Sequence, residues 1–575
     1  MVRWNLEDIY PKEETEQRIN DYTKLVDNFI SQKKELTKDI SPKKFLDLVK
    51  QYEQITLEAH ILSQRPGLQS VEDITNPQFR KEEQEMDSFF TEQGNKLIYF
   101  MHFFKDLPDE KAKEIISEAG KYEYFLKSKR KAKPHTRTTE EEKIINLKDL
   151  SGESGLSAIR DIVVGNLTFE FQGKKYNESE LSPFCLSEKE EERKEAFTSL
   201  LGVYKDNKEI LGEVYKNIAL DWANETTKIR SYKTPISARN FSNDLPDEVV
   251  DTVLDVITEK RTIFQDFFKL KSELLGIENN RDNIYAPYIL KDKKEYSYEE
   301  AKKITYSVFE EFSSEAFSLA KNIFEKDHVH SEVLPNKMGG AFCSSYGKDK
   351  IPYVMLNHMG KLEDVSTMCH EIGHGVHGQL AKDKTEFTFH SSIALAEVAS
   401  IFSELLLKEK MMKTASEEEK KYLLIKELDG NFASILRQAY FVKFEMEAHE
   451  KVQKGVTVDE LTNTYYSLLK EQFGDTKVDE KYSYEWLRIP HIYNSPFYCY
   501  SYSFANLTVL ALYNQFKIEG KESFVPKYLN ILKSGGDADV VDIMGKAGFD
   551  ITKRDFWEGA FNEIEKTVDE LKDLI

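Results

Sequence analysis

The chain has 575 residues, of which 40% are hydrophobic and 31% charged, and its formal net charge is −21. Its 36 phenylalanines and 29 tyrosines supply enough apolar area for a large core, which excludes intrinsic disorder as the main state. A chain this acidic repels phosphate backbones, so we expect no nucleic-acid partner. No run of about 18 apolar residues occurs, so we expect no membrane span.

The N-terminus and the cysteines indicate a cytoplasmic protein. Residues 1–10 lack the apolar segment of a secretory signal. The four cysteines are scattered and form no CxxC pair, which suits a reducing compartment and excludes a thiolate zinc knuckle. No obligate protein partner is evident from the sequence.

Low glycine and proline content predicts a mainly α fold. Capping boxes are expected at Thr139–Glu142, Ser187–Glu190 and Ser297–Glu300. Strands are expected at 166–171 and as a small antiparallel pair at 339–345 and 352–357, just before the most informative motif. A change in composition near residue 195 predicts an N-terminal helical region, 1–195, and a catalytic region, 196–575.

The most informative motif is His370-Glu-Ile-Gly-His374, an HExxH pattern. Two histidines at i and i+4 lie on one helix face and can share a tetrahedral metal, while Glu371 can reach a water molecule on that metal. Gly373 inside the helix costs about 1 kcal/mol of helix propensity. Close approach of substrate or metal to the backbone would explain that cost.

A third ligand is needed if the fourth position is to hold water. The metzincin pattern requires Gly at 377 and His at 380, but the chain has His377 and Leu380, so that subclass is excluded. Glu386, Glu397 and Glu404 are the candidates. We favour Glu397, because it is a lone carboxylate among small apolar residues that let two helices pack closely. Glu404 is expected to support a ligand from behind.

The other histidines in this region are not expected to bind the metal. His377 lies one turn beyond His374, and three neighbouring histidines of one helix cannot all meet one tetrahedral ion. We therefore expect His377 to support the ligands or the fold. His358 and His390 are expected to be structural.

A second cluster lies downstream, where six tyrosines occur within the 21 residues from 482 to 502. His491 and tyrosines 498, 500 and 502 could donate hydrogen bonds to a developing oxyanion. An aromatic core stripe is the competing interpretation. Tyr498 and Tyr502 share a helix face and Tyr500 points away, so at least one set is expected in the core.

Taken together, several segments resemble the oligoendopeptidase F branch of the thimet oligopeptidase-like gluzincins. The resemblance covers nearly the whole chain through these segments: Trp4–Tyr10, Tyr296–Ala301, Gly339–Phe342, His370–His377, Ala396–Ser400, Glu404 and Pro490–Tyr502.

The resemblance implies a two-lobed helical shell around a deep channel with one zinc ion on its floor. It implies a zinc metalloendopeptidase that cleaves internal bonds of short unstructured peptides and excludes folded proteins. It places His370, His374 and Glu397 on zinc, with Glu371 as general base.

For the substrate, the resemblance implies that His491 and a tyrosine bind the scissile carbonyl, with Tyr500 preferred and Tyr498 second. It also implies that Gly339, Gly340, Ala341 and Phe342 form a strand edge that pairs with the substrate backbone.

Two alternatives stay open. A zinc carboxypeptidase or dipeptidase would capture a peptide terminus, for which Arg488 is the nearby basic candidate. A non-catalytic helical peptide-binding protein could keep a relic metal site, although the intact Glu371 argues against it. Imidazole and carboxylate ligands suit Zn²⁺ but also Co²⁺ and Mn²⁺.

Overall fold

The computed structural model describes residues 3–290 and 294–575. Its contacts group into two compact units. Unit 1 consists of Met1–Lys133, Asp292–Met411 and Glu519–Gly548, and unit 2 of Pro134–Lys291, Met412–Ile518 and Phe549–Ile575. The predicted boundary between residues 195 and 196 lies inside one helix, Glu190–Asp206, and stays a prediction about regions of the sequence.

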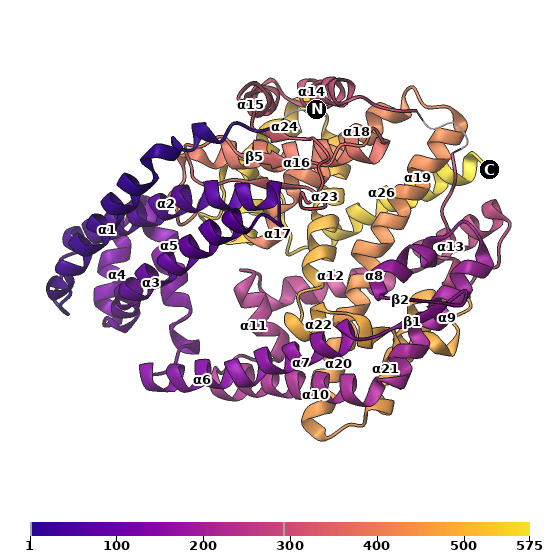
Figure 1. Ribbon diagram of the computed structural model, residues 1–575, viewed down its shortest axis with the longest axis horizontal. Coiled ribbons are helices and arrows are strands. Elements are labelled where there is room, and N and C mark those ends of the chain that lie inside the picture. The colour runs from indigo at the N-terminus through magenta and orange to yellow at the C-terminus, as the bar shows by residue number, and fades with distance from the viewer. Residues whose placement is uncertain (1–2, 291–293) are drawn as a thin grey trace. The chain divides into compact units, whose positions relative to one another are not determined.

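The predicted mainly α fold is confirmed (Figure 1). The helices of unit 1 are α1 (Thr15–Ser31), α2 (Pro42–Glu72), α3 (Pro77–Asp106), α4 (Asp109–Ser117), α5 (Glu123–Lys131), α14 (Tyr298–Phe312), α15 (Ser314–Glu325), α16 (Leu362–Leu380), α17 (Ile393–Ala396), α18 (Val398–Met412), α24 (Lys521–Lys533) and α25 (Val540–Lys546). Within the described residues, no helix combines the length and the apolar content needed to cross a membrane.

Helices α1, α2 and α3 run side by side and bury one aromatic core (Figure 1). Phe45 stacks on Phe100 and Phe104, with ring centroids 5.2 and 5.1 Å apart, and Phe29 meets Phe100 edge-on at 5.1 Å. Each such pair contributes about 0.5–1.5 kcal/mol beyond its buried area. The apolar face of each helix therefore explains why these three long helices pack together.

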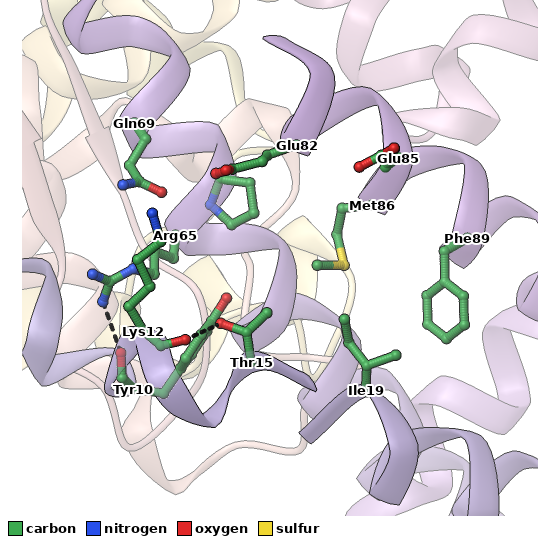
Figure 2. Close-up of a pocket in the computed structure, with 11 residues that line it drawn as sticks. Tyr10, Lys12, Thr15, Ile19, Arg65, Gln69, Glu82, Glu85, Met86 and Phe89 are labelled. Carbon is green, nitrogen blue, oxygen red and sulfur yellow. Dashed lines mark hydrogen bonds between the residues drawn. The ribbon is translucent and has the colours of Figure 1, made fainter. Parts of the chain in front are cut away.

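A cavity of about 380 Å³ lies beside this core (Figure 2). Its apolar wall is formed mainly by Ile19, Met86 and Phe89. On the other side, the buried Arg65 guanidinium donates to the carbonyl oxygens of Leu6 and Tyr10. These bonds hold the N-terminal segment against α2.

The small sheet of unit 1 packs against α16. The predicted antiparallel pair is confirmed as β4 (Phe342–Ser344) and β5 (Tyr353–Met355), each shorter than expected. A further strand, β3 (Val329–His330), joins β5 in parallel and has too few residues to show a sequence pattern. The strand order β3-β5-β4 leaves β4 at an edge of the sheet.

Unit 2 is also built from helices: α6 (Thr139–Ser151), α7 (Glu153–Gly165), α8 (Glu178–Leu181), α9 (Glu190–Asp206), α10 (Lys208–Ala223), α11 (Pro235–Ser242), α12 (Asp247–Glu259), α13 (Thr262–Leu275), α19 (Glu417–Asn431), α20 (Arg437–Lys454), α21 (Val458–Phe473), α22 (His491–Asn494), α23 (Tyr500–Glu519) and α26 (Arg554–Asp573). The strand predicted at 166–171 is one arm of a hairpin, β1 (Phe169–Phe171) with β2 (Lys174–Tyr176).

The core of unit 2 contains a buried ionic network. The Glu485 carboxylate accepts hydrogen bonds from Arg281 at 2.9 Å, Arg437 at 3.1 Å and the Tyr465 hydroxyl at 3.1 Å. Burial by itself would raise the pKa of Glu485, but the two guanidinium groups hold it at about 2. Removing one partner would leave a buried charge uncompensated, which is strongly destabilising.

The helix ends agree only in part with the predicted capping boxes. Ser297 and Glu300 form the predicted box at the start of α14. The first box is shifted by one residue, because Thr138 and Glu141 form it. The box predicted at Ser187 is wrong, since Lys189 precedes α9 and the Ser187 hydroxyl donates instead to Glu192.

Candidate metal centre

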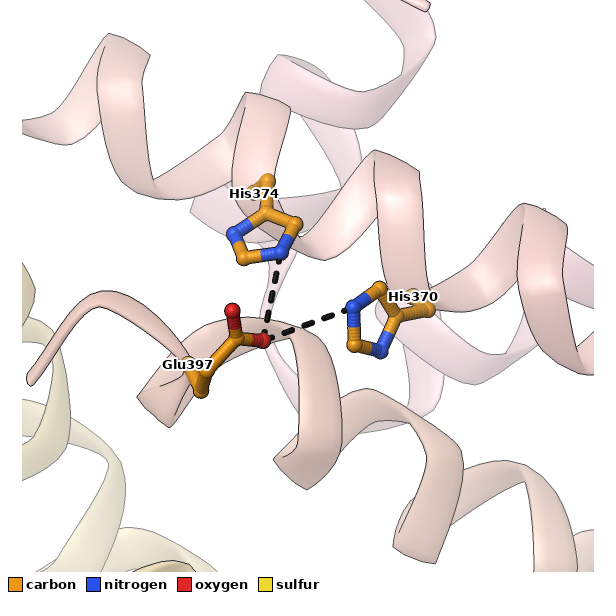
Figure 3. Close-up of side chains that lie close together, drawn as sticks. All are labelled: His370, His374 and Glu397. Carbon is orange, nitrogen blue, oxygen red and sulfur yellow. Dashed lines mark ion pairs between the residues drawn. The ribbon is translucent and has the colours of Figure 1, made fainter. Parts of the chain in front are cut away.

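Three of the predicted ligand atoms converge in unit 1. His370 and His374 lie one turn apart on α16, and their Nε2 atoms are 3.4 and 3.3 Å from Oε2 of Glu397. Figure 3 shows both imidazoles turned toward that carboxylate. The three ligand atoms all lie within 4.8 Å of one another. The structure therefore brings together the two histidines of the motif and the favoured third residue.

Glu397 reaches the histidines because α16 and α18 approach each other closely. It lies at the junction between α17 and α18. A Cβ atom on Gly373 would be 2.7 Å from the Ala399 carbonyl oxygen and 2.8 Å from the Ser400 Cα atom. The expected reason for Gly373, close approach of substrate or metal, is therefore corrected: the backbone of α18 fills that space.

Glu404 fixes the orientation of His370. Its Oε1 atom is 2.7 Å from Nδ1 of His370, and its Oε2 atom accepts a hydrogen bond from the Ser366 hydroxyl at 2.8 Å. The bond between Glu404 and His370 keeps the proton on Nδ1 and leaves the Nε2 lone pair facing Glu397. Carboxylate partners of this kind orient ligating histidines and make them better donors to a metal.

Two further contacts hold Glu397 itself. The Ser400 hydroxyl donates to Oε2 of Glu397 at 2.7 Å. His377 is buried and hydrogen-bonds to the backbone of Ala396, the residue before Glu397. Burial lowers the pKa of His377 to about 4, so its ring is neutral at ordinary pH. The sequence does not predict this role of Ser400, because a serine gives no sequence signal of its hydrogen-bond partner.

The electrostatics of the site separate the two glutamates. Burial alone would raise the pKa of Glu397, but His374 and the Ser400 hydroxyl hold it at about 2, so Glu397 stays ionised. Burial raises the pKa of Glu371 above its ordinary value, against the opposing effect of both imidazoles. A raised pKa suits a residue that accepts a proton and releases it again.

The donor set fits a divalent metal. Two imidazole nitrogens and one carboxylate oxygen form the ligand set of catalytic zinc sites, which keep a fourth position open. A second close group of carboxylates, Asp149, Asp221 and Glu225 in unit 2, is different. The Lys148 ammonium lies among them, at 3.1, 2.8 and 3.2 Å. Glu225 is also paired with Arg230 at 2.8 Å, so these carboxylates belong to an ion-pair network.

Two cavities adjoin the three ligand atoms. One, of about 440 Å³, is lined by Gly340, Ala341, His370, Glu371 and Glu404, among others. The other, of about 520 Å³, includes Ala341, Phe342, Glu371, His374, His377 and Glu397. Three residues of the predicted strand edge therefore line the same space as the predicted base. Gly339 is exposed and lines neither cavity.

The remaining candidates of the motif region contribute none of the three ligand atoms, although His358 lines the smaller cavity. The Glu386 carboxylate is buried, with its Oε1 atom 2.7 Å from Nδ1 of His60. His358 is buried and hydrogen-bonds to the carbonyl oxygen of Tyr296 at 2.8 Å. Both groups therefore stabilise the fold of unit 1. His390 lines the larger cavity.

The downstream candidates form a cluster within unit 2. The rings of His491 and Tyr498 are parallel, with centroids 6.0 Å apart, and Tyr502 meets both edge-on. The Tyr502 hydroxyl is 3.3 Å from Nε2 of His491. His491 and Tyr498 are half-buried and Tyr502 is 37% exposed. These three side chains can offer hydrogen-bond donors at one surface of the unit.

Tyr500 is placed differently, and this disagrees with the preference for it over Tyr498. It is 1% exposed, and its hydroxyl accepts a hydrogen bond from the Asn243 amide at 2.7 Å. Tyr498 lies in the turn before α23 and is half-buried, whereas Tyr500 and Tyr502 lie two residues apart on α23 and therefore point in different directions, Tyr500 into the core and Tyr502 outward. Tyr498 is therefore the better placed of the two predicted tyrosines in this structure.

Comparison with known proteins decides the family. The sequence model of peptidase family M3 matches residues 184–563, and that of Oligopeptidase F matches residues 104–169. The chain belongs to peptidase family M3. This family consists of metallopeptidases, which agrees with the histidine and glutamate group in unit 1.

Relatives of this M3 peptidase are named as oligopeptidases or oligoendopeptidases F. Oligopeptidase PepF of Bacillus subtilis is 27% identical over 100% of this chain and 87% of its own. An oligoendopeptidase F homolog of Borreliella burgdorferi is 28% identical over 100% of this chain and 98% of its own. The resemblance to the oligoendopeptidase F branch is thereby confirmed.

Solved structures agree on the fold. A crystal structure from Chlamydophila abortus has a TM-score of 0.90 at 24% identity and covers 100% of this chain and 98% of that one. Oligoendopeptidase-F from Enterococcus faecium has a TM-score of 0.71 at 21% identity, covering 98% and 99%. At these identities the likeness concerns the fold alone.

Proposed function

We propose that this M3 peptidase is a zinc endopeptidase that hydrolyses internal bonds of short unstructured oligopeptides. The observation that carries the proposal is the convergence of His370, His374 and Glu397 beside a cavity that Glu371 lines. The relatives named oligoendopeptidase F support the substrate class.

In this proposal His370 and His374 bind zinc through Nε2 and Glu397 binds through its carboxylate. When bound, zinc would polarise the scissile carbonyl and lower the pKa of a water molecule. Glu404 holds His370 in the correct tautomer through Nδ1. His377 and Ser400 keep Glu397 at the end of α17 and in the correct rotamer.

Glu371 would act as the general base. Its carboxylate removes a proton from the attacking water, and the same carboxyl group then gives that proton to the leaving amine. Its raised pKa brings it closer to the working pH in both steps. Its burial also keeps bulk water from competing for the proton.

Substrate binding would use an edge strand and neutral donors. The unpaired edge of β4 offers backbone groups to an extended peptide, in the β-augmentation mode, next to Gly340 and Ala341. His491 and Tyr498 would donate hydrogen bonds to the oxygen that becomes negative in the transition state.

The two alternatives predict different products. Arg488, the candidate for binding a terminal carboxylate, is paired with Glu178, which weighs against the carboxypeptidase interpretation. A relic binding protein would hydrolyse nothing.

The test is hydrolysis of an internally quenched peptide of about ten residues. Wild type and Glu371→Gln are compared at matched zinc content, with products identified by mass. We expect wild type to cut an internal bond and the variant to lose about 10²–10⁴ in kcat while retaining zinc. Glu363→Gln, at the start of the same helix and outside both cavities, is the matched control.

Three results would contradict the proposal. Equal rates for wild type and Glu371→Gln would show that another base acts. Release of terminal residues alone would favour the carboxypeptidase. Zinc-loaded protein that cuts no peptide would favour the binding protein.

A further inference from the structure

Phe497 adopts a backbone conformation that side chains other than glycine rarely take. Its φ angle is +60°, and it directly precedes Tyr498. A non-glycine residue in this region is strained and persists only where the surrounding contacts fix its conformation. The contacts of this one residue therefore decide the direction in which the chain enters Tyr498.

Two side chains from other helices hold this bend. Oε1 of Glu445, on α20, accepts a hydrogen bond from the Phe497 backbone N–H at 2.7 Å. Nε of Arg239, on α11, donates to the Pro496 carbonyl oxygen at 3.0 Å. The Pro496 carbonyl and the Phe497 N–H belong to the same peptide group. The two hydrogen bonds therefore fix the plane of that peptide.

The acceptor is completely buried. Glu445 is 0% exposed, and its Oε2 atom has no hydrogen-bond partner among the described residues. His449 follows one turn later on α20, also without a partner for either ring nitrogen, and its ring packs on Phe497 at 4.6 Å. A carboxyl group kept in such surroundings costs free energy, and the fold of α20 alone gives no reason for it.

The bend leads directly into the cluster of His491, Tyr498 and Tyr502. Tyr498 lies one residue after Phe497, and its ring is parallel to that of His491. A change in φ of Phe497 to an ordinary negative value would rotate the Tyr498 side chain away from this stack. Glu445 itself does not reach the cluster, so any effect on it passes through the backbone.

We propose that Glu445 is a positioning residue that, together with Arg239, holds the Phe497 bend and so sets Tyr498 against His491. The inference rests on the proposed function of these two side chains as donors to the substrate carbonyl. Glu445 acts by accepting a hydrogen bond, which a neutral carboxyl group or an amide can also do.

The protonation state of Glu445 follows from its surroundings. The groups that face it are Arg239 on α11, Tyr215 on α10 and the Cys499 thiol. Burial raises the pKa of Glu445 to about 8, while the Phe497 N–H and Arg239 act to lower it. The group is thus mainly protonated at neutral pH. Stability gained from the neutral form is complete below the ordinary pKa of 4.5 and is lost as pH rises toward 8.

An amide signal tests the bend without any activity. Proline and phenylalanine follow each other at 183–184 and 496–497. Labelling proline with ¹³C at the carbonyl and phenylalanine with ¹⁵N therefore selects the amides of Phe184 and Phe497, and Phe184 serves as internal control.

In wild type we expect a low-field Phe497 amide that exchanges slowly and titrates with a midpoint near pH 8. Glu445→Gln should keep the slow exchange and lose the titration. Glu445→Met should make exchange at least about tenfold faster. A Phe497 amide that is unaffected in Glu445→Met would overturn the proposal.

Kinetics test the positioning role. With zinc content unchanged, we expect Glu445→Met to lower kcat at least about tenfold with little change in KM, and Glu445→Gln to restore most of it. Should Glu445→Met fail to fold, Arg239→Ala removes the second bond from a half-buried position and should lower kcat in the same direction. Arg554→Ala, which removes exposed ion pairs from Arg554 to Glu259 and Glu558, is the control.

The outcomes separate this inference from the proposed function. If wild type cuts no peptide, the proposed function fails, while the amide results still decide whether Glu445 holds the bend. If wild type cuts peptides and Glu445→Met loses the amide protection but keeps its kcat, the positioning role is wrong. Equal damage from Glu445→Gln and Glu445→Met would also overturn it, because the acceptor would then not be what matters.

Discussion

Two regions of this M3 peptidase place their functional candidates by different means. In unit 1, His370 and His374 occupy successive turns of one regular helix, and Glu397 lies directly before α18, the helix that packs against Gly373. In unit 2, His491 and Tyr498 lie on either side of an irregular segment whose shape depends on the left-handed residue Phe497.

The difference explains why the arrangement of the first region could be predicted from the sequence and that of the second could not. Helical periodicity alone puts residues i and i+4 on one face, so the HExxH pattern carries its geometry with it. The bend at Phe497 has no such local pattern, because Glu445 and Arg239, which hold it, lie far away in the sequence. The helix pair should therefore tolerate changes in its surroundings better than the segment does.

The largest expected effect comes from removing Glu397, the proposed third ligand. Glu397→Ala leaves two imidazoles, too few for a stable catalytic site, so zinc content and activity should both fall. We expect a loss of about 10³-fold or more in kcat/KM, since the metal contributes several kcal/mol to the transition state. Glu386→Ala, the rejected candidate, is the comparison. Retention of one zinc ion per chain in Glu397→Ala would contradict the assignment.

A smaller effect is expected from removing the proposed hydrogen-bond donors of unit 2. His491→Ala and Tyr498→Phe should each lower kcat by about 10²–10³-fold with zinc retained, the usual cost of one oxyanion donor. Tyr500→Phe should have less effect on kcat, because its hydroxyl is bonded to Asn243 in the core. Single-turnover rates of the three variants decide the matter. A larger loss in Tyr500→Phe than in Tyr498→Phe would restore the original preference for Tyr500.

The next smaller effect is expected from Glu404, the hydrogen-bond partner of His370. Glu404→Gln keeps the shape of the side chain but weakens its pull on the Nδ1 proton, so zinc affinity should fall about 10–100-fold. Ser366→Ala, which removes only the hydroxyl that bonds Glu404, should have a weaker effect in the same direction. Competition with a zinc chelator measures both. Unchanged affinity in Glu404→Gln would show that Glu404 does not tune the ligand.

The smallest effect concerns the contact between the two helices. Gly373→Ala would place a methyl group against the Ala399 carbonyl oxygen, so α16 and α18 must separate. Overpacking of this kind costs about 1–3 kcal/mol of unfolding free energy. Thermal unfolding of the zinc-free protein measures it, with Gly430→Ala as control, since a Cβ there meets nothing within 4 Å. Equal melting temperatures for Gly373→Ala and wild type would contradict the close approach.

The sequence by itself determined the mainly α fold, the antiparallel pair before α16 and the two histidines with Glu371 on one helix. Each depends on local periodicity or on turn signals between neighbouring residues. The choice of Glu397 also came from the sequence, because a lone carboxylate among small residues is unusual on a helix that packs closely.

Only the tertiary structure decided what depends on contacts between distant segments. It placed α18 rather than a ligand against Gly373, turned Tyr500 into the core, and put Glu445 under the Phe497 bend. The physical reason is the same in each case. A side chain's burial and its hydrogen-bond partner are set by whichever element packs against it, and no local pattern encodes which element that is.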